Sequence, residues 1–98
     1  MEGNRIELSG RLVDEPELRT TPGGMPVLKL VVDCGQAPER LRLGIVMAGE
    51  SGRQAAGMLR RGGVVRVTGR LRAVTQRAGG AGRGVEVIAS GIEPQDEK

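Results

Sequence analysis

Five short segments of this 98-residue chain alternate apolar and polar residues, and this period-two pattern constrains the fold more than any other feature. Such alternation is typical of a β-strand that buries one face. The segments are Asn4–Val13, Val27–Asp33, Leu41–Met47, Val64–Val74 and Val85–Ile92. Gly10 falls on the apolar face of the first segment, where a strand can bend sharply to close a barrel. The chain therefore favours an all-β fold.

The connections between these segments carry the residues that end strands. Asp14–Pro26 is rich in proline and glycine and is expected to be a loop. Ser51–Arg61 changes to helical spacing, which predicts a short helix with Ser51 as its N-cap. Gly62 and Gly63 would end that helix, and Glu93–Lys98 is expected to be a short polar tail.

The predicted order is strand, strand, strand, helix, strand, strand, within one domain that covers residues 1–98. Five strands in so short a chain must roll up, because an open sheet would leave unpaired edges. A short helix between the third and fourth strands is the layout of the five-stranded OB-fold, a Greek-key barrel. We therefore predict an OB-fold barrel over about residues 4–93.

The composition excludes several classes of site. The chain has no Phe, Trp, Tyr or His and one cysteine, Cys34. A His/Cys zinc site, an intramolecular disulfide and a Ser-His-Asp triad are therefore impossible, and bases cannot stack on aromatic rings. No cofactor or metal is expected, and Cys34 is interpreted as a small apolar core residue. No apolar run approaches the length of a membrane span and no signal sequence is recognisable, so we expect a cytoplasmic protein.

The positive charge of the chain comes almost entirely from arginine. Lysine and arginine number 15 against 12 acidic residues, and only Lys29 and Lys98 are lysines. Arginine suits forked contacts with phosphate and flat stacking on bases. A GC-rich genome would enrich arginine in the same way, so both interpretations stay open.

Several segments resemble one known family. Asn4–Gly10 resembles the first strand of the bacterial single-stranded-DNA-binding (SSB) family, and Asp14–Gly24 the loop that follows it there. Leu59–Leu71 is similar to the helix end and fourth strand of that family. Within it, Pro22–Pro26 and Val46–Gly49 look like motifs of the PriB proteins (primosomal replication protein N), and the chain ends soon after the barrel. It departs from PriB in lacking a tryptophan on the third strand and in its short Cys34–Glu39 loop.

The resemblance implies a non-enzymatic homodimer that binds single-stranded DNA and the PriA helicase, and so supports replication restart with other primosome proteins. The edge of the first strand, Arg5–Val13, is the expected site of pairing between two copies. Two alternatives to this role stay open. One is mainly a protein-docking OB adaptor with weak DNA binding, and the other is an SSB-like protein without the usual tail.

In OB-folds the oligonucleotide crosses strands two and three, between the loops that join strands one to two and four to five. The basic residues near that surface are predicted to bind DNA: Arg19, Lys29, Arg40, Arg42, Arg72, Arg77 and Arg83. Arg77 and Arg83 flank a glycine-rich loop, which lets backbone amides approach phosphates. The alternative for each is ordinary surface charge, with Arg19 opposite Glu15 or Glu17 and with Arg40 and Arg42 opposite Glu39.

Two further arginines, Arg66 and Arg70, are expected on a face of the fourth strand that points away from the DNA and serves a dimer or helicase contact. A small nuclease is the enzymatic alternative. Asp14, Asp33 and Glu86 would have to supply its metal ligands, but they lie on separate elements without metal-ligand spacing. The sequence thus favours a binding protein over an enzyme.

Overall fold

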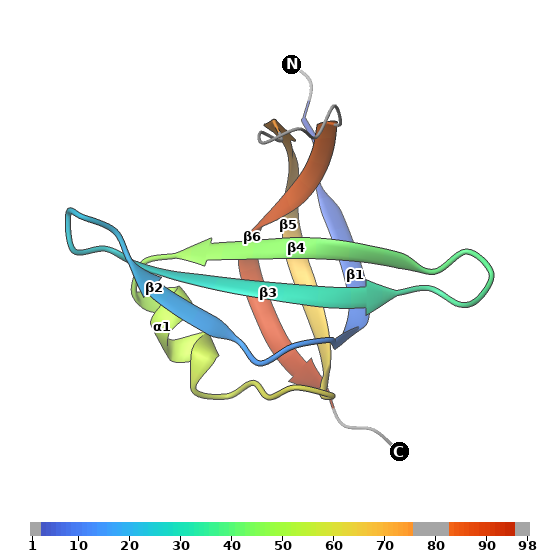
Figure 1. Cartoon of the computed structure of the whole chain (residues 1–98), viewed down its shortest axis with the longest axis horizontal. Helices are drawn as coiled ribbons and strands as arrows, with labels where there is room; N and C mark the ends of the chain where they lie inside the picture. Colours follow the sequence, from blue (N-terminus) through green and yellow to red (C-terminus); the bar gives the residue numbers. More distant parts are fainter. Residues whose placement is uncertain (1–2, 76–82, 96–98) are drawn as a thin grey trace.

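The computed structural model describes residues 3–75 and 83–95, without the side chains of Thr75 and Arg83. This part of the chain forms six strands and one helix (Figure 1). In chain order they are β1 (Ile6–Leu12), β2 (Glu17–Thr20), β3 (Pro26–Cys34), β4 (Leu41–Ala48), α1 (Glu50–Ala56), β5 (Val64–Thr75) and β6 (Arg83–Gln95). No helix within these ranges is long and apolar enough to cross a membrane.

The strands close into a ring. Their order in the sheet is β1-β5-β6-β4-β3-β2, and β1 also pairs with β3. All pairings are antiparallel except that of β4 with β6. In Figure 1, β3 and β4 cross in front of β5 and β6, and α1 lies below one end of β3 and β4. The predicted OB-fold barrel, with its short helix between the third and fourth barrel strands, is confirmed.

The interior of the barrel is aliphatic, as the lack of aromatic residues requires. Alternate residues of each strand point inward, so that Leu28, Leu30 and Val32 of β3 are buried while Lys29 between them is exposed. The other fully buried large side chains are Leu12, Ile45, Val65, Val67 and Val87. Burying each such side chain contributes roughly 1.5–3 kcal/mol. No polar or charged residue is buried within the described ranges.

Gly10 allows the sharp closure between β1 and β3. A Cβ at this position would lie 2.7 Å from the backbone oxygen of Asp33 and 3.0 Å from the Cys34 sulfur. β1 pairs with β5 over Ile6–Arg11, and Arg11 and Leu12 also pair with β3. Cys34 packs against the core as expected, and burial, aided by the Asp33 carboxylate, raises the pKa of its thiol.

The prediction that Asp14–Pro26 is wholly a loop is wrong, because β2 forms within it. Glu17–Thr20 pairs antiparallel with Pro26–Lys29, through a turn in which the Thr21 hydroxyl accepts a hydrogen bond from the Met25 amide at 3.1 Å. Every β2 residue is exposed, so no apolar face marks the strand in the sequence. Its position follows from backbone pairing with β3 alone.

The predicted helix limits are also wrong. α1 begins after Gly49, whose φ of 84° favours glycine, and no side chain caps it. It ends at Ala56, before Met58 and Arg61. A Cβ at Gly52 would lie 2.2 Å from the Met47 oxygen, so close packing on the end of β4 sets where the helix begins. Further along, Glu93–Gln95 pairs with Val64–Arg66 as part of β6 and is not a tail.

Candidate nucleic-acid interface

The outer face of β3 and β4 is built by the same alternation that fills the core. Val27, Lys29 and Val31 point outward from β3, between the buried residues of that strand. On β4 their register partners are Ala48, Val46 and Gly44. The result is an apolar floor with one lysine in its middle.

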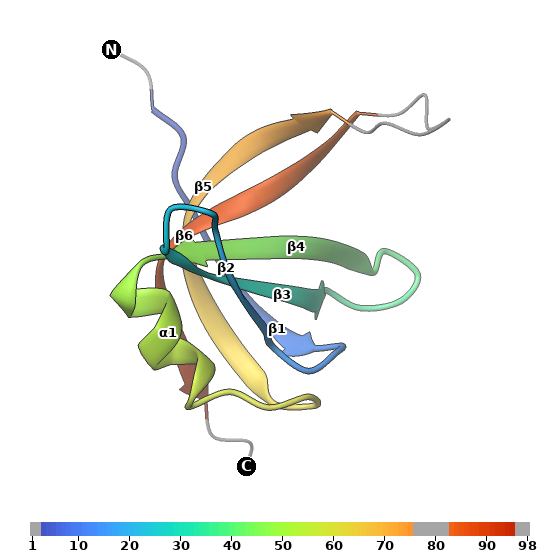
Figure 2. The same ribbon diagram turned by 60° about the vertical axis from the view of Figure 1, so that its left-hand side comes forward.

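One end of this face is a basic hollow of about 450 Å³. Its cations are Arg19 from β2, Lys29 from β3 and Arg72 from β5, and its apolar floor is Val27, Val46 and Ala48. Figure 2 shows how the β5–β6 hairpin and β4 extend to the same side of the molecule, so that residues far apart in the chain reach one surface. Three of the predicted binding residues therefore gather here.

The cations of the basic hollow differ in their partners. The Arg19 guanidinium donates to Glu17 Oε2 at 2.7 Å, as one alternative for this residue anticipated. The Arg72 Nε donates to Glu86 Oε2 at 3.0 Å, and its Nη2 contacts the same oxygen. Lys29 forms no ion pair with any residue that the structure describes.

An acidic hollow of about 240 Å³ lies next to the basic one. Asp14, Glu15, Glu17 and Glu86 supply four carboxylates around Lys29, and Gly44 and Val31 form part of its floor. Lys29, Val46 and Glu86 line both hollows. No local pattern in the sequence marks this cluster, because its members come from a loop and two different strands.

Arg40 and Arg42 lie beyond the acidic hollow, at the start of β4. Arg42 is the register partner of Asp33, and its Nε is 3.7 Å from Asp33 Oδ1. Arg40 is 3.9 Å from the other carboxylate oxygen, so both contacts are longer than hydrogen bonds. The alternative pairing with Glu39 is therefore wrong, and Asp33 is the acid beside both arginines.

The remaining predicted residues are less well defined. Arg77, with Gly79, Gly80 and Gly82, lies outside the described residues. The backbone of Arg83 begins β6 opposite Thr75, and its side chain is not described. Arg72, the weaker candidate in the sequence, reaches the basic hollow from this hairpin, together with Glu86.

Arg66 and Arg70 of β5 separate in the structure. Arg66 pairs with Glu7 of β1 at 3.5 Å. Arg70 is the register partner of Ile88, which in turn pairs with Val46 at the edge of the basic hollow. Arg70 lines neither the basic nor the acidic hollow, and lies with Arg5 at a separate hollow between β1, β5 and β6. Its role in a dimer or helicase contact stays a prediction.

The interface offers contacts for a polyanion. Within the described ranges, no three His, Cys, Asp or Glu side chains come close enough together to hold a metal ion. The cations at the basic end suit phosphates, and the valine floor suits the faces of bases.

Comparisons with known proteins agree with this geometry. Residues 3–95 match the single-strand binding protein family. The crystal structure of the SSB domain of a Synechococcus sp. protein is similar in fold, with a TM-score of 0.78 and 23% identity. The similarity covers 95% of this chain and 97% of that one. A search of curated protein sequences finds no significant match.

Proposed function

This chain belongs to the single-strand binding protein family, and we propose that it binds single-stranded DNA across β3 and β4 without catalysing a reaction. The observation that carries the proposal is the basic hollow, where Arg19, Lys29 and Arg72 surround an apolar floor. Phosphates would contact these cations while bases lie over Val27 and Val46. Arg40 and Arg42 would extend the contacts at the far end of β4.

Competition with carboxylates sets the strength of this binding. Arg19 and Arg72 must exchange Glu17 and Glu86 for phosphate. Exposed ion pairs contribute only about 0–1 kcal/mol each, so the exchange costs little for Arg19 and Glu17, whereas Glu86 beside Arg72 is half-buried. Stacking on aromatic side chains, which contributes about 1–3 kcal/mol per base elsewhere, is impossible here. Binding should therefore be mainly electrostatic and strongly dependent on salt.

Fluorescence anisotropy tests this proposal. The probe is a labelled oligo-dT of about 30 nucleotides, longer than the 4–16 nucleotides that one OB barrel covers. The logarithm of affinity should fall with the logarithm of salt concentration by about 0.7 per phosphate neutralised, so the three cations of the basic hollow contribute about −2 to the slope, and Arg40 and Arg42 add to it. Duplex DNA of the same length is the control. No binding at low salt, or equal affinity for the duplex, would contradict the proposal.

We also propose the narrower role of a PriB-like cytoplasmic protein that binds the PriA helicase in replication restart. The acidic hollow favours an adaptor version of this role, because four carboxylates in the middle of the groove weaken DNA binding. A Lys29→Glu variant that loses DNA but retains PriA in a pull-down would support the adaptor. Absence of a PriA complex with either protein would exclude it.

A homodimer formed along β1 is part of the same proposal. Ile6–Gly10 pairs with β5 on one side, and within the described part of the chain its other edge has no strand partner. An unpaired edge is able to accept a strand from a second copy. Light scattering at several concentrations should give twice the 10.3 kDa chain mass, and a monomer throughout would contradict the dimer.

A further inference from the structure

We propose a second phosphate-binding site, outside the β3–β4 groove, in which Arg5 and Arg70 hold the DNA strand after it leaves the basic hollow. The inference rests on the proposed function and extends it. The site is a hollow of about 480 Å³ where the start of β1 meets β5 and β6. We call it the β1–β5 hollow, and its polar residues are Asn4, Arg5, Thr68, Arg70 and Ser90.

The β1–β5 hollow contains two arginines and no carboxylate. Neither Arg5 nor Arg70 forms an ion pair with a described residue. The nearby Glu7 is 3.5 Å from Arg66, four residues before Arg70. Two adjacent guanidinium groups without a counter-charge repel each other in the free protein, and a phosphate between them removes that repulsion. Arginine forks are also well matched to phosphate oxygens.

Asn4 holds the start of the chain against this hollow. Its Nδ2 donates to the Leu71 oxygen at 3.0 Å, and its Oδ1 accepts from the Leu71 amide at 2.7 Å. The side chain thus continues the ladder of β1 and β5 beyond its last backbone pair, Ile6 with Gly69. Arg5, between Asn4 and Ile6, is therefore held beside Arg70 on the neighbouring strand.

The far wall is held by close packing of β5 on β6. The register of these strands shifts at Thr68/Gly69, which leaves Ser90 as the extra residue of a bulge. A Cβ at Gly69 would lie only 2.2 Å from the Ile88 oxygen, so the two backbones approach closely at this point. The Ser90 hydroxyl donates to the Thr68 oxygen at 3.3 Å across the bulge. The hollow therefore exists before any ligand arrives.

One row of register partners joins the β1–β5 hollow to the basic hollow, although no residue lines both. Lys29 pairs with Val46, Val46 with Ile88, and Ile88 with Arg70. Val46 lines the basic hollow and Ile88 lines the β1–β5 hollow. Three strand spacings separate Lys29 from Arg70 by about 14 Å. A strand that crosses Lys29 and rests bases on Val46 and Ile88 would arrive at Arg70 and Arg5.

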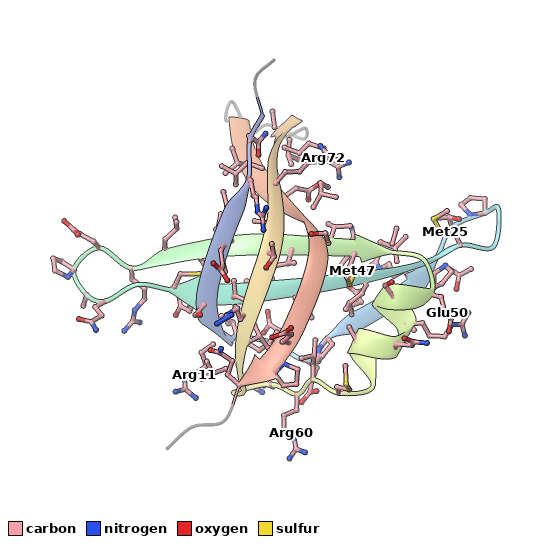
Figure 3. The ribbon with its side chains drawn as sticks, turned by 180° about the vertical axis from the view of Figure 1, so that it is seen from behind. Arg11, Met25, Met47, Glu50, Arg60 and Arg72 are labelled. Carbon is pink, nitrogen blue, oxygen red and sulfur yellow. The ribbon has the colours of Figure 1, made fainter. Side chains whose placement is uncertain are left out.

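The salt slope and a second variant separate the two sites. The variant is Arg5→Ala/Arg70→Ala, tested with a long probe, labelled oligo-dT of about 30 nucleotides, beside Lys29→Ala, which changes the basic hollow and not the β1–β5 hollow. The matched control is Arg60→Ala/Arg61→Ala, since both are exposed and form no ion pair in the described structure. Figure 3 shows Arg60 at the end of the molecule opposite Arg72 of the hairpin.

We expect the Arg5/Arg70 variant to bind the long probe about tenfold more weakly at low salt, with a salt slope shallower by about 1.4 for two lost phosphates. The same shallower slope should appear when Arg5→Ala/Arg70→Ala is added to Lys29→Ala, because the two changes lie in different hollows. Unchanged affinity for the long probe, or an equal loss in the Arg60/Arg61 control, would overturn the second site but leave the groove intact. A change in the oligomeric mass of the Arg5/Arg70 variant on light scattering would show that these residues contact a second copy of the chain, and would overturn the DNA site. If the unaltered protein does not bind the long probe, both proposals fail.

Discussion

The basic and acidic hollows share a wall on the same two strands and yet suit opposite ligands. Val46, Lys29 and Glu86 belong to both. What differs is the set of neighbours, since Arg19 and Arg72 border one hollow while Asp14 and Glu15 border the other. The preference of this surface for phosphate is thus determined by the loop and strands beside β3 and β4, and not by the floor that those strands provide.

Lys29→Glu should have the largest effect on the affinity of this surface for single-stranded DNA. It removes the one cation that the two hollows share and that lacks a carboxylate partner among the described residues. Affinity for single-stranded DNA should fall at least tenfold, or about 1.4 kcal/mol, in an anisotropy titration. Arg60→Glu is the control with equal charge change. An equal loss in both would show that net charge, and not the groove, governs binding.

Glu86→Gln should act in the opposite direction and more weakly. The change removes a carboxylate from both hollows and frees the guanidinium of Arg72. We expect affinity to rise about threefold, in line with the roughly 0–1 kcal/mol of an exposed ion pair. Glu50→Gln breaks the matched Glu50–Arg53 pair on α1, outside both hollows, and should change affinity little. Weaker binding by the Glu86 variant would mean that this carboxylate positions Arg72 for phosphate.

Asp14→Asn/Glu15→Gln tests the acidic hollow by itself. Both residues are exposed, so solvent and salt screen their repulsion of phosphate. Affinity should rise about twofold at low salt and hardly at all at about 0.15 M, where the screening length is about 8 Å. Glu50→Gln/Glu93→Gln is a control with the same change in net charge. A gain that persists at high salt would indicate a direct steric effect of the loop.

Gly44→Ala should have the smallest effect, because it adds a methyl group to the floor of the acidic hollow. A Cβ there meets nothing within 4 Å, so the free energy of unfolding should stay within about 0.5 kcal/mol in urea titration. Gly69→Ala, where the Cβ would lie 2.2 Å from the Ile88 oxygen, should lose about 1–3 kcal/mol. Equal stability of the two variants would show that β5 and β6 adjust more easily than their packing suggests.

Prediction from the sequence succeeded where one face of an element is buried. Alternation marked the five barrel strands because every second residue enters the core. It did not mark β2, whose residues are exposed on both faces, or the start of α1, which depends on how closely Gly52 packs against Met47. Of the predicted site, Arg19, Lys29 and Arg72 come together, whereas Arg77 and the side chain of Arg83 lie outside the described residues.

The sequence by itself determined the all-β barrel, its aliphatic core and the exclusion of aromatic stacking, because these follow from residue types and from a period of two along the chain. Only the tertiary structure decided which charges meet. Glu86 lies against Arg72, Asp33 against Arg42, and Arg5 and Arg70 face a hollow without a carboxylate. These contacts depend on strand register and barrel curvature, which bring together residues far apart in the chain. No local sequence pattern encodes such contacts.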